Sequence, residues 1–301
     1  MTEVTNLNKQ WGIKNQLTFD TTHTGLVIAN INSNHASASI ALQGAHLMTW
    51  TPTGEKPAIW LSPDATLAPG SSIRGGVPIC WPWFGAHKTR SDFPAHGLAR
   101  TVPWQVTNTA QRSTGEIAIT FQLDSTNIPT KRWPQPTSAE CQITIGKTLA
   151  ITLTTFNKSQ NPITIGEALH TYFSISDVRN ISINGLDGCR YLDKIADMQQ
   201  KQQTADITFA GEVDRIYLGT KADCIIHDPG LSRRIYIRKK GSESTVVWNP
   251  WAEKSTQMGD MGEDGYLKMV CVESANTANN LITIPAGDSH QLTVSYHLET
   301  I

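Results

Sequence analysis

The chain has 301 residues, of which 39% are hydrophobic and 17% are charged, a composition typical of a globular protein and not of a disordered one. Its 25 Lys and Arg residues nearly balance its 26 Asp and Glu residues, so the net charge of -1 gives no support for a nucleic-acid-binding protein. A small anionic ligand remains open, because it needs only a few well-placed cations.

Short runs of β-forming residues recur along the chain. Many alternate between polar and apolar residues, as in AITLTTFN over 150–157, which is typical of antiparallel strands with one buried face. Helical periodicity is weak, with short candidates at 193–200 and 252–261, and there is no βαβ alternation. The sequence therefore predicts an all-β fold: one large antiparallel β-sandwich over residues 1–301 with a few short helices. The clearest expected strands are 26–31, 36–42, 116–123, 141–145, 150–156, 234–237 and 291–297.

The cysteines indicate a reducing compartment. They are five in number, and no two have the spacing of a CxxC motif. The first residues of the chain hold no apolar run of signal-peptide length, and no apolar run approaches the roughly 18 residues that span a membrane. We therefore expect a cytoplasmic protein with reduced thiols that contacts neither a membrane nor nucleic acid.

Four segments interrupt the strand pattern: 70–100, 166–178, 213–217 and 246–276. They are rich in Gly, Pro, Trp, His and charged residues, and binding and catalytic residues concentrate in such segments when a rigid scaffold holds them. In the first segment, Arg74 and Arg100 lie at the two ends with no obvious acidic partner. The planar guanidinium group suits phosphate, because it gives two parallel charge-assisted hydrogen bonds.

The same segment contains several aromatic residues. Trp81, Trp83 and Phe84 can form an apolar platform for a sugar ring, or they can close one end of the sandwich. His96 precedes Gly97, so it can enter a tight pocket.

The second segment carries His170 at the end of an expected strand. A histidine can act as acid or base near neutral pH, although a lone histidine at a strand end is more often structural. Glu167 and Asp177 are close enough in sequence to orient it.

The third and fourth segments supply carboxylates. Asp214 can accept hydrogen bonds from sugar hydroxyls, or it can form a surface pair with Arg215. Glu273 follows the apolar strand 267–272, where burial raises the pKa of a carboxyl group and makes it a better base.

Several other chemistries lack their sequence signatures. There is no nucleotide-binding GxGxxG or GxxxxGK[ST], no HExxH and no GxSxG. The nine histidines include no HxH pair, so a metal site would need ligands that are distant in the sequence. The many acidic residues leave a two-carboxylate glycosidase open.

Together these segments resemble the hexose-6-phosphate mutarotases, a branch of the aldose 1-epimerase superfamily. The resemblance covers nearly the whole chain, and the ordered set of motifs is specific. The matching stretches are IRGGVPICWPWFG (73–85), HGLAR (96–100), EALHTYFSISDV (167–178), INGLDG (183–188), YLDK (191–194), EVDRIY (212–217), VVWNPW (246–251) and MVCVESAN (269–276).

The resemblance implies a galactose-mutarotase-like β-supersandwich that interconverts the α and β anomers of D-hexose 6-phosphates, with glucose 6-phosphate as the expected substrate. It implies that His170 and Glu273 are the catalytic pair and that no metal or organic cofactor takes part. For ring opening we expect Glu273 to take the O1 proton as the base and protonated His170 to give a proton to O5.

The resemblance also assigns substrate-binding residues. Arg74 and Arg100 would hold the phosphate, His96 would line the site, and Asp214 would contact sugar hydroxyls. The resemblance leaves open the roles of three other residues of this region and its motifs, namely Lys88, Trp83 and Trp248.

Two alternatives remain at this point. A non-catalytic carbohydrate-binding or sugar-sensing protein on the same fold would not need His170 and Glu273 beside one sugar ring. A sandwich that presents its surface to another protein would have no basic pocket. We expect a monomer whose partner is the small phosphosugar.

Overall fold

The computed structural model describes residues 3–124, 127–128 and 131–301, and its regular structure consists mainly of antiparallel β-strands. Within these ranges there are two α-helices, α1 (Glu3–Trp11) and α2 (Trp251–Met258). Neither has the length and apolar character needed to cross a lipid bilayer. Short 3₁₀ turns are η1 (Ala99–Thr101), η3 (Val178–Asn180), η4 (Pro229–Leu231) and η5 (Gly265–Lys268).

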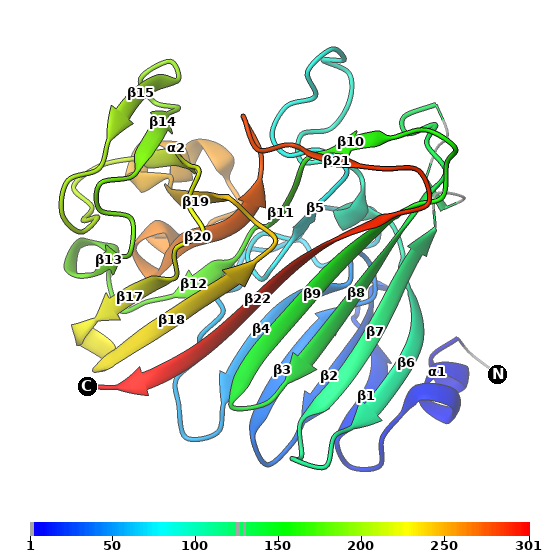
Figure 1. Ribbon diagram of the computed structural model, residues 1–301. Coiled ribbons are helices and arrows are strands. Elements are labelled where there is room, and N and C mark those ends of the chain that lie inside the picture. Colours follow the sequence, from blue (N-terminus) through cyan, green and yellow to red (C-terminus); the bar gives the residue numbers. More distant parts are fainter. Residues whose placement is uncertain (1–2, 125–126, 129–130) are drawn as a thin grey trace.

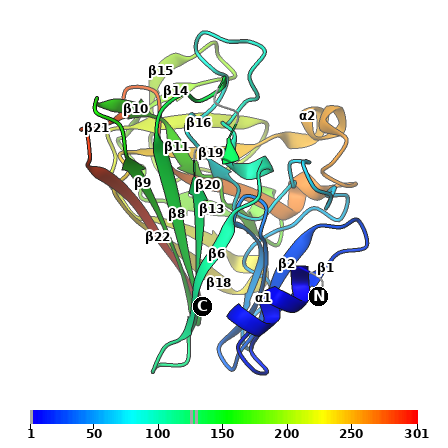
Figure 2. The ribbon, with the colours of Figure 1, turned by 90° about the vertical axis from the view of Figure 1, so that its right-hand side faces the viewer.

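Two sheets face each other and enclose the main core (Figures 1 and 2). The four-stranded sheet consists of β1 (Leu17–Thr21), β2 (Val27–Asn32), β3 (Ala36–Ala41) and β4 (His46–Pro52), in that order. We call the opposing eight-stranded sheet the long sheet. In spatial order its strands are β13 (Ser182–Asn184), β17 (Cys224–Asp228), β18 (Arg233–Lys240), β22 (Ser289–Thr300), β9 (Thr148–Asn157), β8 (Thr137–Ile145), β7 (Ile117–Asp124) and β6 (Gln105–Gln111).

A second eight-stranded sheet, here called the site sheet, carries the residues of interest. In spatial order its strands are β15 (Gln199–Gln202), β14 (Arg190–Asp193), β16 (Val213–Leu218), β19 (Ser244–Asn249), β20 (Met269–Asn276), β11 (Glu167–Leu169) and β5 (Ile79–Cys80), and β12 (Tyr172–Ser174) also pairs with β20. A two-stranded ribbon of β10 (Ile163–Ile165) and β21 (Ile282–Ile284) completes the described strands.

Polarity alternation decides which side chains of the site sheet face the core. Val270 and Val272 of β20 belong to the main hydrophobic cluster. Cys271 and Glu273 lie between and after them and therefore project from the opposite face. In β16, which β19 separates from β20, Asp214 projects from that same outer face, because Val213 faces the core. One face of the site sheet is thus structural and the other is available for chemistry.

The main core joins the sheets. Trp50 of the four-stranded sheet is fully buried, and its indole N–H donates to the carbonyl oxygen of Gly146, beside the long sheet, at 3.2 Å. Phe121 and Leu153 of the long sheet belong to the same cluster, and both are fully buried.

Most sequence-based expectations for the fold are confirmed. Each of the seven expected strands falls within one residue of an observed strand or inside a longer one, and the helix expected at 252–261 is α2. The helix expected at 193–200 is wrong. The chain there leaves β14, turns through Asp197 and Met198, which both have positive φ, and returns as β15. Helix α1 lies outside the expected elements.

Candidate active site

A pocket of about 310 Å³ opens on the outer face of the site sheet. All six residues with expected catalytic or binding roles line it, and they come from the four irregular segments that the sequence singled out. The full lining is Arg74, Phe84, His96, Arg100, His170, Tyr172, Lys194, Asp214, Val246, Trp248, Lys254, Met258 and Glu273.

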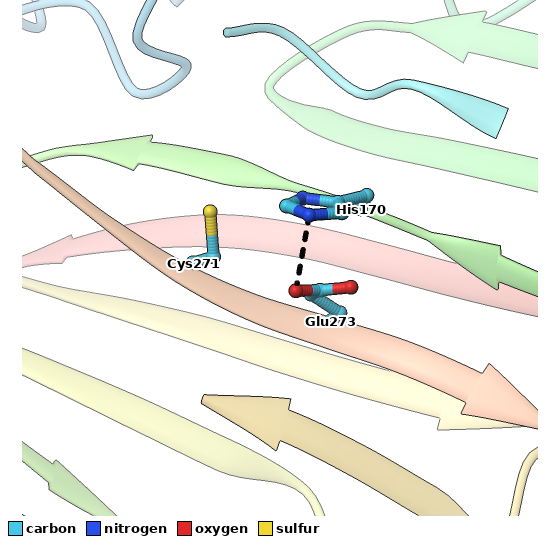
Figure 3. Close-up of side chains that lie close together, drawn as sticks. All are labelled: His170, Cys271 and Glu273. Carbon is cyan, nitrogen blue, oxygen red and sulfur yellow. Dashed lines mark ion pairs between the residues drawn. The ribbon is translucent and has the colours of Figure 1, made fainter. Parts of the chain in front are cut away.

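His170 and Glu273 meet at the floor of this pocket. Glu273 lies in β20, and His170 lies in the break between β11 and β12. Nε2 of His170 is 3.4 Å from Oε1 of Glu273 (Figure 3). The backbone N–H of His170 donates to the carbonyl oxygen of Pro78 at 3.0 Å and fixes the break. The two side chains are 12% and 1% exposed, so a ligand reaches them only through the pocket.

The expectation that Glu167 or Asp177 orients His170 is wrong. Glu167 lies on the inner face of β11, where its carboxylate accepts a hydrogen bond from Asn276 at 2.9 Å and contacts His290 at 3.1 Å. Asp177 instead caps the η3 turn. The alternation of this segment places Leu169 towards the core, whereas His170 and Tyr172 face the pocket, so Glu167 lies on the opposite face from His170.

Aromatic rings hold the imidazole of His170 in place. Tyr172 is stacked on it with ring centroids 5.0 Å apart and an angle of 15° between the planes. Trp248 and His96 meet it edge-on, at 6.0 Å and 5.6 Å. Because three rings surround it, the imidazole has little freedom to turn away from Glu273.

Burial and nearby charges set the protonation of the pair. Desolvation, followed by repulsion from Asp214, raises the pKa of Glu273 well above its ordinary value. Desolvation, followed by repulsion from His96 and from both arginines of the pocket, lowers the pKa of His170 well below its ordinary value. The raised pKa of Glu273 agrees with expectation. Both shifts favour the uncharged forms of the pair, a carboxylic acid beside a neutral imidazole.

The two arginines lie at the pocket with donors to spare. Nε of Arg74 donates to Asp260 at 3.0 Å, and its Nη1 donates to the hydroxyl of Tyr172 at 3.0 Å. The expected lack of an acidic partner is therefore wrong for Arg74, because the partner comes from a distant loop. Arg100 donates through Nη2 to the carbonyl oxygen of Ala95 at 3.0 Å. Each guanidinium group has five N–H donors in total, so both retain donors for an anion.

His96 enters the pocket through an unusual backbone conformation. Its φ is 66° and that of Gly97 is 76°, and its N–H donates to the carbonyl oxygen of Gly85 at 2.8 Å. Its ring packs edge-on against Phe84 at 4.9 Å. Burial, and next the charge of Arg100, lowers the pKa of His96 to about 3. It is therefore neutral near pH 7 and suits a hydroxyl group as donor or acceptor.

Asp214 is a buried pocket residue and not part of a surface pair with Arg215. Its Oδ2 lies 2.7 Å from Nζ of Lys194, and its side chain is 8% exposed. Arg215 projects from the other face of β16, where its guanidinium group stacks over Tyr191 at 4.8 Å. The alternation along β16 separates the two neighbours.

Two lysines of the pocket were missed from the sequence. Lys194 is the last residue of the YLDK stretch, which was a signal for it, and it pairs with Asp214. Lys254 lies in α2, and its Nζ is 2.6 Å from Oε1 of Glu212. No local pattern distinguished Lys254 from a lysine on an exposed helix.

The aromatic residues divide between support and lining. Trp81 is fully buried, and its indole N–H donates to Thr155 at 3.0 Å, so it closes the sandwich as the structural alternative suggested. Phe84 and Trp248 line the pocket. Trp83 and Lys88 line a neighbouring groove of about 630 Å³ instead.

Comparisons with known proteins agree with this fold. The sequence model of the aldose 1-epimerase family matches residues 27–297. A "Putative glucose-6-phosphate 1-epimerase" of Escherichia coli (strain K12) is 39% identical over 246 residues, which is 81% of each chain. A crystal structure of a "putative mutarotase (YeaD)" from Salmonella typhimurium has a TM-score of 0.90 at 33% identity and covers 97% of this chain and 96% of its own. A "galactose mutarotase-like protein" from Clostridium acetobutylicum shares the fold with a TM-score of 0.71 at 12% identity, over 95% of this chain and 98% of its own. The chain therefore belongs to the aldose 1-epimerase family.

Proposed function

We propose that this protein is an isomerase that interconverts the α and β anomers of D-hexose 6-phosphates, with glucose 6-phosphate as its main substrate. The observation that carries the proposal is the 3.4 Å contact of His170 with Glu273 inside a pocket that also contains Arg74 and Arg100. A curated relative named for glucose 6-phosphate supports the substrate class. The contact favours a catalyst over a non-catalytic sugar-binding protein, and the basic pocket argues against a mere protein-docking surface.

Anomer exchange opens the sugar ring, the resulting aldehyde group rotates about the C1–C2 bond, and O5 then attacks the other face of C1 to close the ring. Opening breaks the C1–O5 bond, while a base takes the proton of O1 and an acid gives a proton to O5. We assign Glu273 as the base and His170 as the acid, and reclosure reverses the two roles. A positioned acid or base contributes about 10²–10⁴-fold in rate.

Because both pKa shifts favour the uncharged forms of the pair, we propose that a proton moves from Glu273 to His170 before the ring opens. A phosphate dianion beside Arg74 and Arg100 offsets the positive charge that lowers the pKa of His170. Substrate binding thus favours proton transfer across the pair, which gives a carboxylate beside an imidazolium. Once the O1 proton has passed to Glu273 and the imidazolium proton to O5, the pair has returned to its uncharged forms. The electrostatics of the pocket therefore favour ring opening.

The remaining groups position the substrate. The phosphate on Arg74 and Arg100 would fix one end of the sugar, and this binding energy would place C1 and O5 at the pair. Neutral His96 and the buried Asp214–Lys194 pair would contact sugar hydroxyls. No cation is needed at C1 itself, where the open aldehyde must rotate.

We further propose that the enzyme acts as a single-domain monomer in the cytoplasm. Its five cysteines are free thiols, four of them buried, which suits a reducing compartment.

Exchange spectroscopy by NMR tests the proposal. Wild-type protein added to glucose 6-phosphate labelled with ¹³C at C1 should increase the rate of exchange between the α and β signals, and heat-denatured protein should not. Ligand-induced shifts without faster exchange would establish a sugar-binding protein instead. The same assay with galactose 6-phosphate and mannose 6-phosphate shows which hydroxyl stereochemistry the pocket accepts best, because the three exchange rates can be compared.

A further inference from the structure

Cys271 lies beside His170 and Glu273 at the floor of the pocket, and its sulfur is a third atom that can bind a metal ion. It precedes Glu273 by two positions in β20, so its thiol projects from the same face of the strand. Its Sγ, a ring nitrogen of His170 and a carboxylate oxygen of Glu273 all lie within 4.8 Å of one another (Figure 3). In the described part of the chain, no other set of three such residues is this close. The proposed anomer exchange gives Cys271 no role.

Two buried polar atoms of this triad have no hydrogen-bond partner. Oε2 of Glu273 and Nδ1 of His170 are buried and have no hydrogen-bond partner. Cys271 is a free thiol with no exposed surface. A buried carboxylate oxygen without a partner is costly, and a cation or a ligand hydroxyl relieves that cost.

The spacing fits one tetrahedral metal ion. Zinc bonds of about 2.0–2.3 Å place neighbouring ligand atoms about 3.3–3.8 Å apart. Nε2 of His170 and Oε1 of Glu273 are already 3.4 Å apart, and Sγ of Cys271 lies within 4.8 Å of a ligand atom of each residue. Cys271 and Glu273 both lie in β20, which pairs with β12 so that Tyr172 is opposite Cys271. This pairing holds the backbone in place while the side chains adjust to the ion.

Ligand chemistry selects the ion. A thiolate, a carboxylate and a neutral imidazole carry two negative charges, so they neutralise one divalent ion in a buried site. Thiolate and imidazole favour Zn²⁺ over Mg²⁺ or Ca²⁺, which prefer oxygen ligands. The arginines of the pocket repel a cation, and direct coordination must outweigh that repulsion.

We propose that His170, Cys271 and Glu273 form an inhibitory Zn²⁺ site whose fourth position opens to the pocket. Binding releases the thiol proton and the proton shared by the pair to solvent, and it engages both groups that would move protons on the sugar. Zn²⁺ and the phosphosugar therefore exclude each other.

Direct binding tests the site without any sugar, so its result does not depend on the proposed enzymatic function. Protein freed of metal with EDTA and transferred to metal-free buffer should bind one Zn²⁺ per chain by calorimetry. Cys271→Ser should weaken binding by at least about tenfold, because loss of even a second-shell partner costs about 10–100-fold. Cys189→Ser is the matched control, since it removes a thiol that is more exposed and lies outside the triad, and it should bind as the wild type does.

Two further measurements separate the site from a general effect on folding. Co²⁺ should give a thiolate-to-metal absorption band in the wild type and in Cys189→Ser but not in Cys271→Ser. Zn²⁺ should raise the unfolding temperature of the wild type and leave that of Cys271→Ser, or of Cys271→Ala if serine is not tolerated, unchanged. Equal Zn²⁺ affinity in the wild type and the Cys271 variants, or no Zn²⁺ binding by the wild type, would overturn the proposal.

Discussion

Replacing Arg74 by alanine should remove the preference of the enzyme for a phosphorylated sugar. Arg74 has five N–H donors. Its Nε donates to Asp260 and one Nη1 proton to Tyr172, so the other Nη1 proton and both Nη2 protons are available to a phosphate group. The side chain of Asp260 is 34% exposed, so water can solvate it in the variant and the stability loss should be small.

The size of the effect follows from these donors. A hydrogen bond to a charged group contributes about 1.5–3 kcal/mol, so the loss of two such bonds raises the barrier by about 3–6 kcal/mol. Each 1.36 kcal/mol is a factor of ten in rate, which gives a decrease in kcat/KM of about 10²–10⁴-fold. Because the side chain of Arg74 is 24% exposed and Arg100 remains, we expect the lower end of this range.

The assay compares two substrates. Anomer exchange of glucose 6-phosphate and of free glucose is measured for the wild type and for Arg74→Ala, and the ratio of the two kcat/KM values should fall by about 100-fold. Arg179→Ala is the matched control, because Arg179 also pairs with an aspartate but lies outside the pocket. An equal loss for both sugars would refute the assignment of Arg74 to the phosphate.

Three smaller predictions concern the surroundings of the site. Tyr172→Phe keeps the ring on His170 but removes the hydroxyl that accepts a hydrogen bond from Arg74, so KM for glucose 6-phosphate should rise more than kcat falls in steady-state kinetics. Gly97→Ala should destabilise the fold by more than the about 1–2 kcal/mol of a left-handed alanine, because its Cβ would lie 2.1 Å from the carbonyl oxygen of Trp81. Gly259→Ala, with open space at its Cβ, should show only the left-handed cost in urea unfolding. The pKa of His290 is raised, chiefly by its hydrogen bond with a buried glutamate, so its stabilising contribution is complete below the unfolded pKa and is lost as pH rises through the folded pKa. The difference in urea midpoint between the wild type and His290→Gln should therefore shrink from pH 6 to pH 9, and a constant difference would show that the pair does not titrate as described.

Local signals in the sequence were sufficient for much of the fold. They made each candidate site residue plausible, and the resemblance to the mutarotases selected among them. Period-two alternation identifies a strand from its own residues, which is why 150–156 could be recognised inside β9. The residue types of Arg74, Arg100 and Asp214 pointed to anion and hydroxyl recognition, and all three line the pocket.

Contacts between distant segments could not be predicted in this way. The distance between His170 and Glu273 depends on the pairing of β12 with β20, and Asp260 reaches Arg74 from a separate loop. The direction of both pKa shifts of the pair depends on burial and on charges from other segments, which a local sequence pattern does not show.

The prediction of a helix at 193–200 was wrong for a different reason. The strand β15 that covers its end has four exposed residues, so it has no buried face to mark it as a strand. Its pairing with β14 and the positive φ values of Asp197 and Met198 define the hairpin, and neither feature is visible in the local pattern.

The central claim is that His170 and Glu273 act as one unit on a phosphorylated sugar. Saturation-transfer NMR on the anomers of glucose 6-phosphate measures this directly for the wild type, His170→Ala, Glu273→Ala and the double variant. Each single variant should lose about 10²–10⁴-fold in exchange rate, and the double variant should be little slower than either, since groups that act together are not additive. Exchange at the wild-type rate in both single variants would contradict the claim.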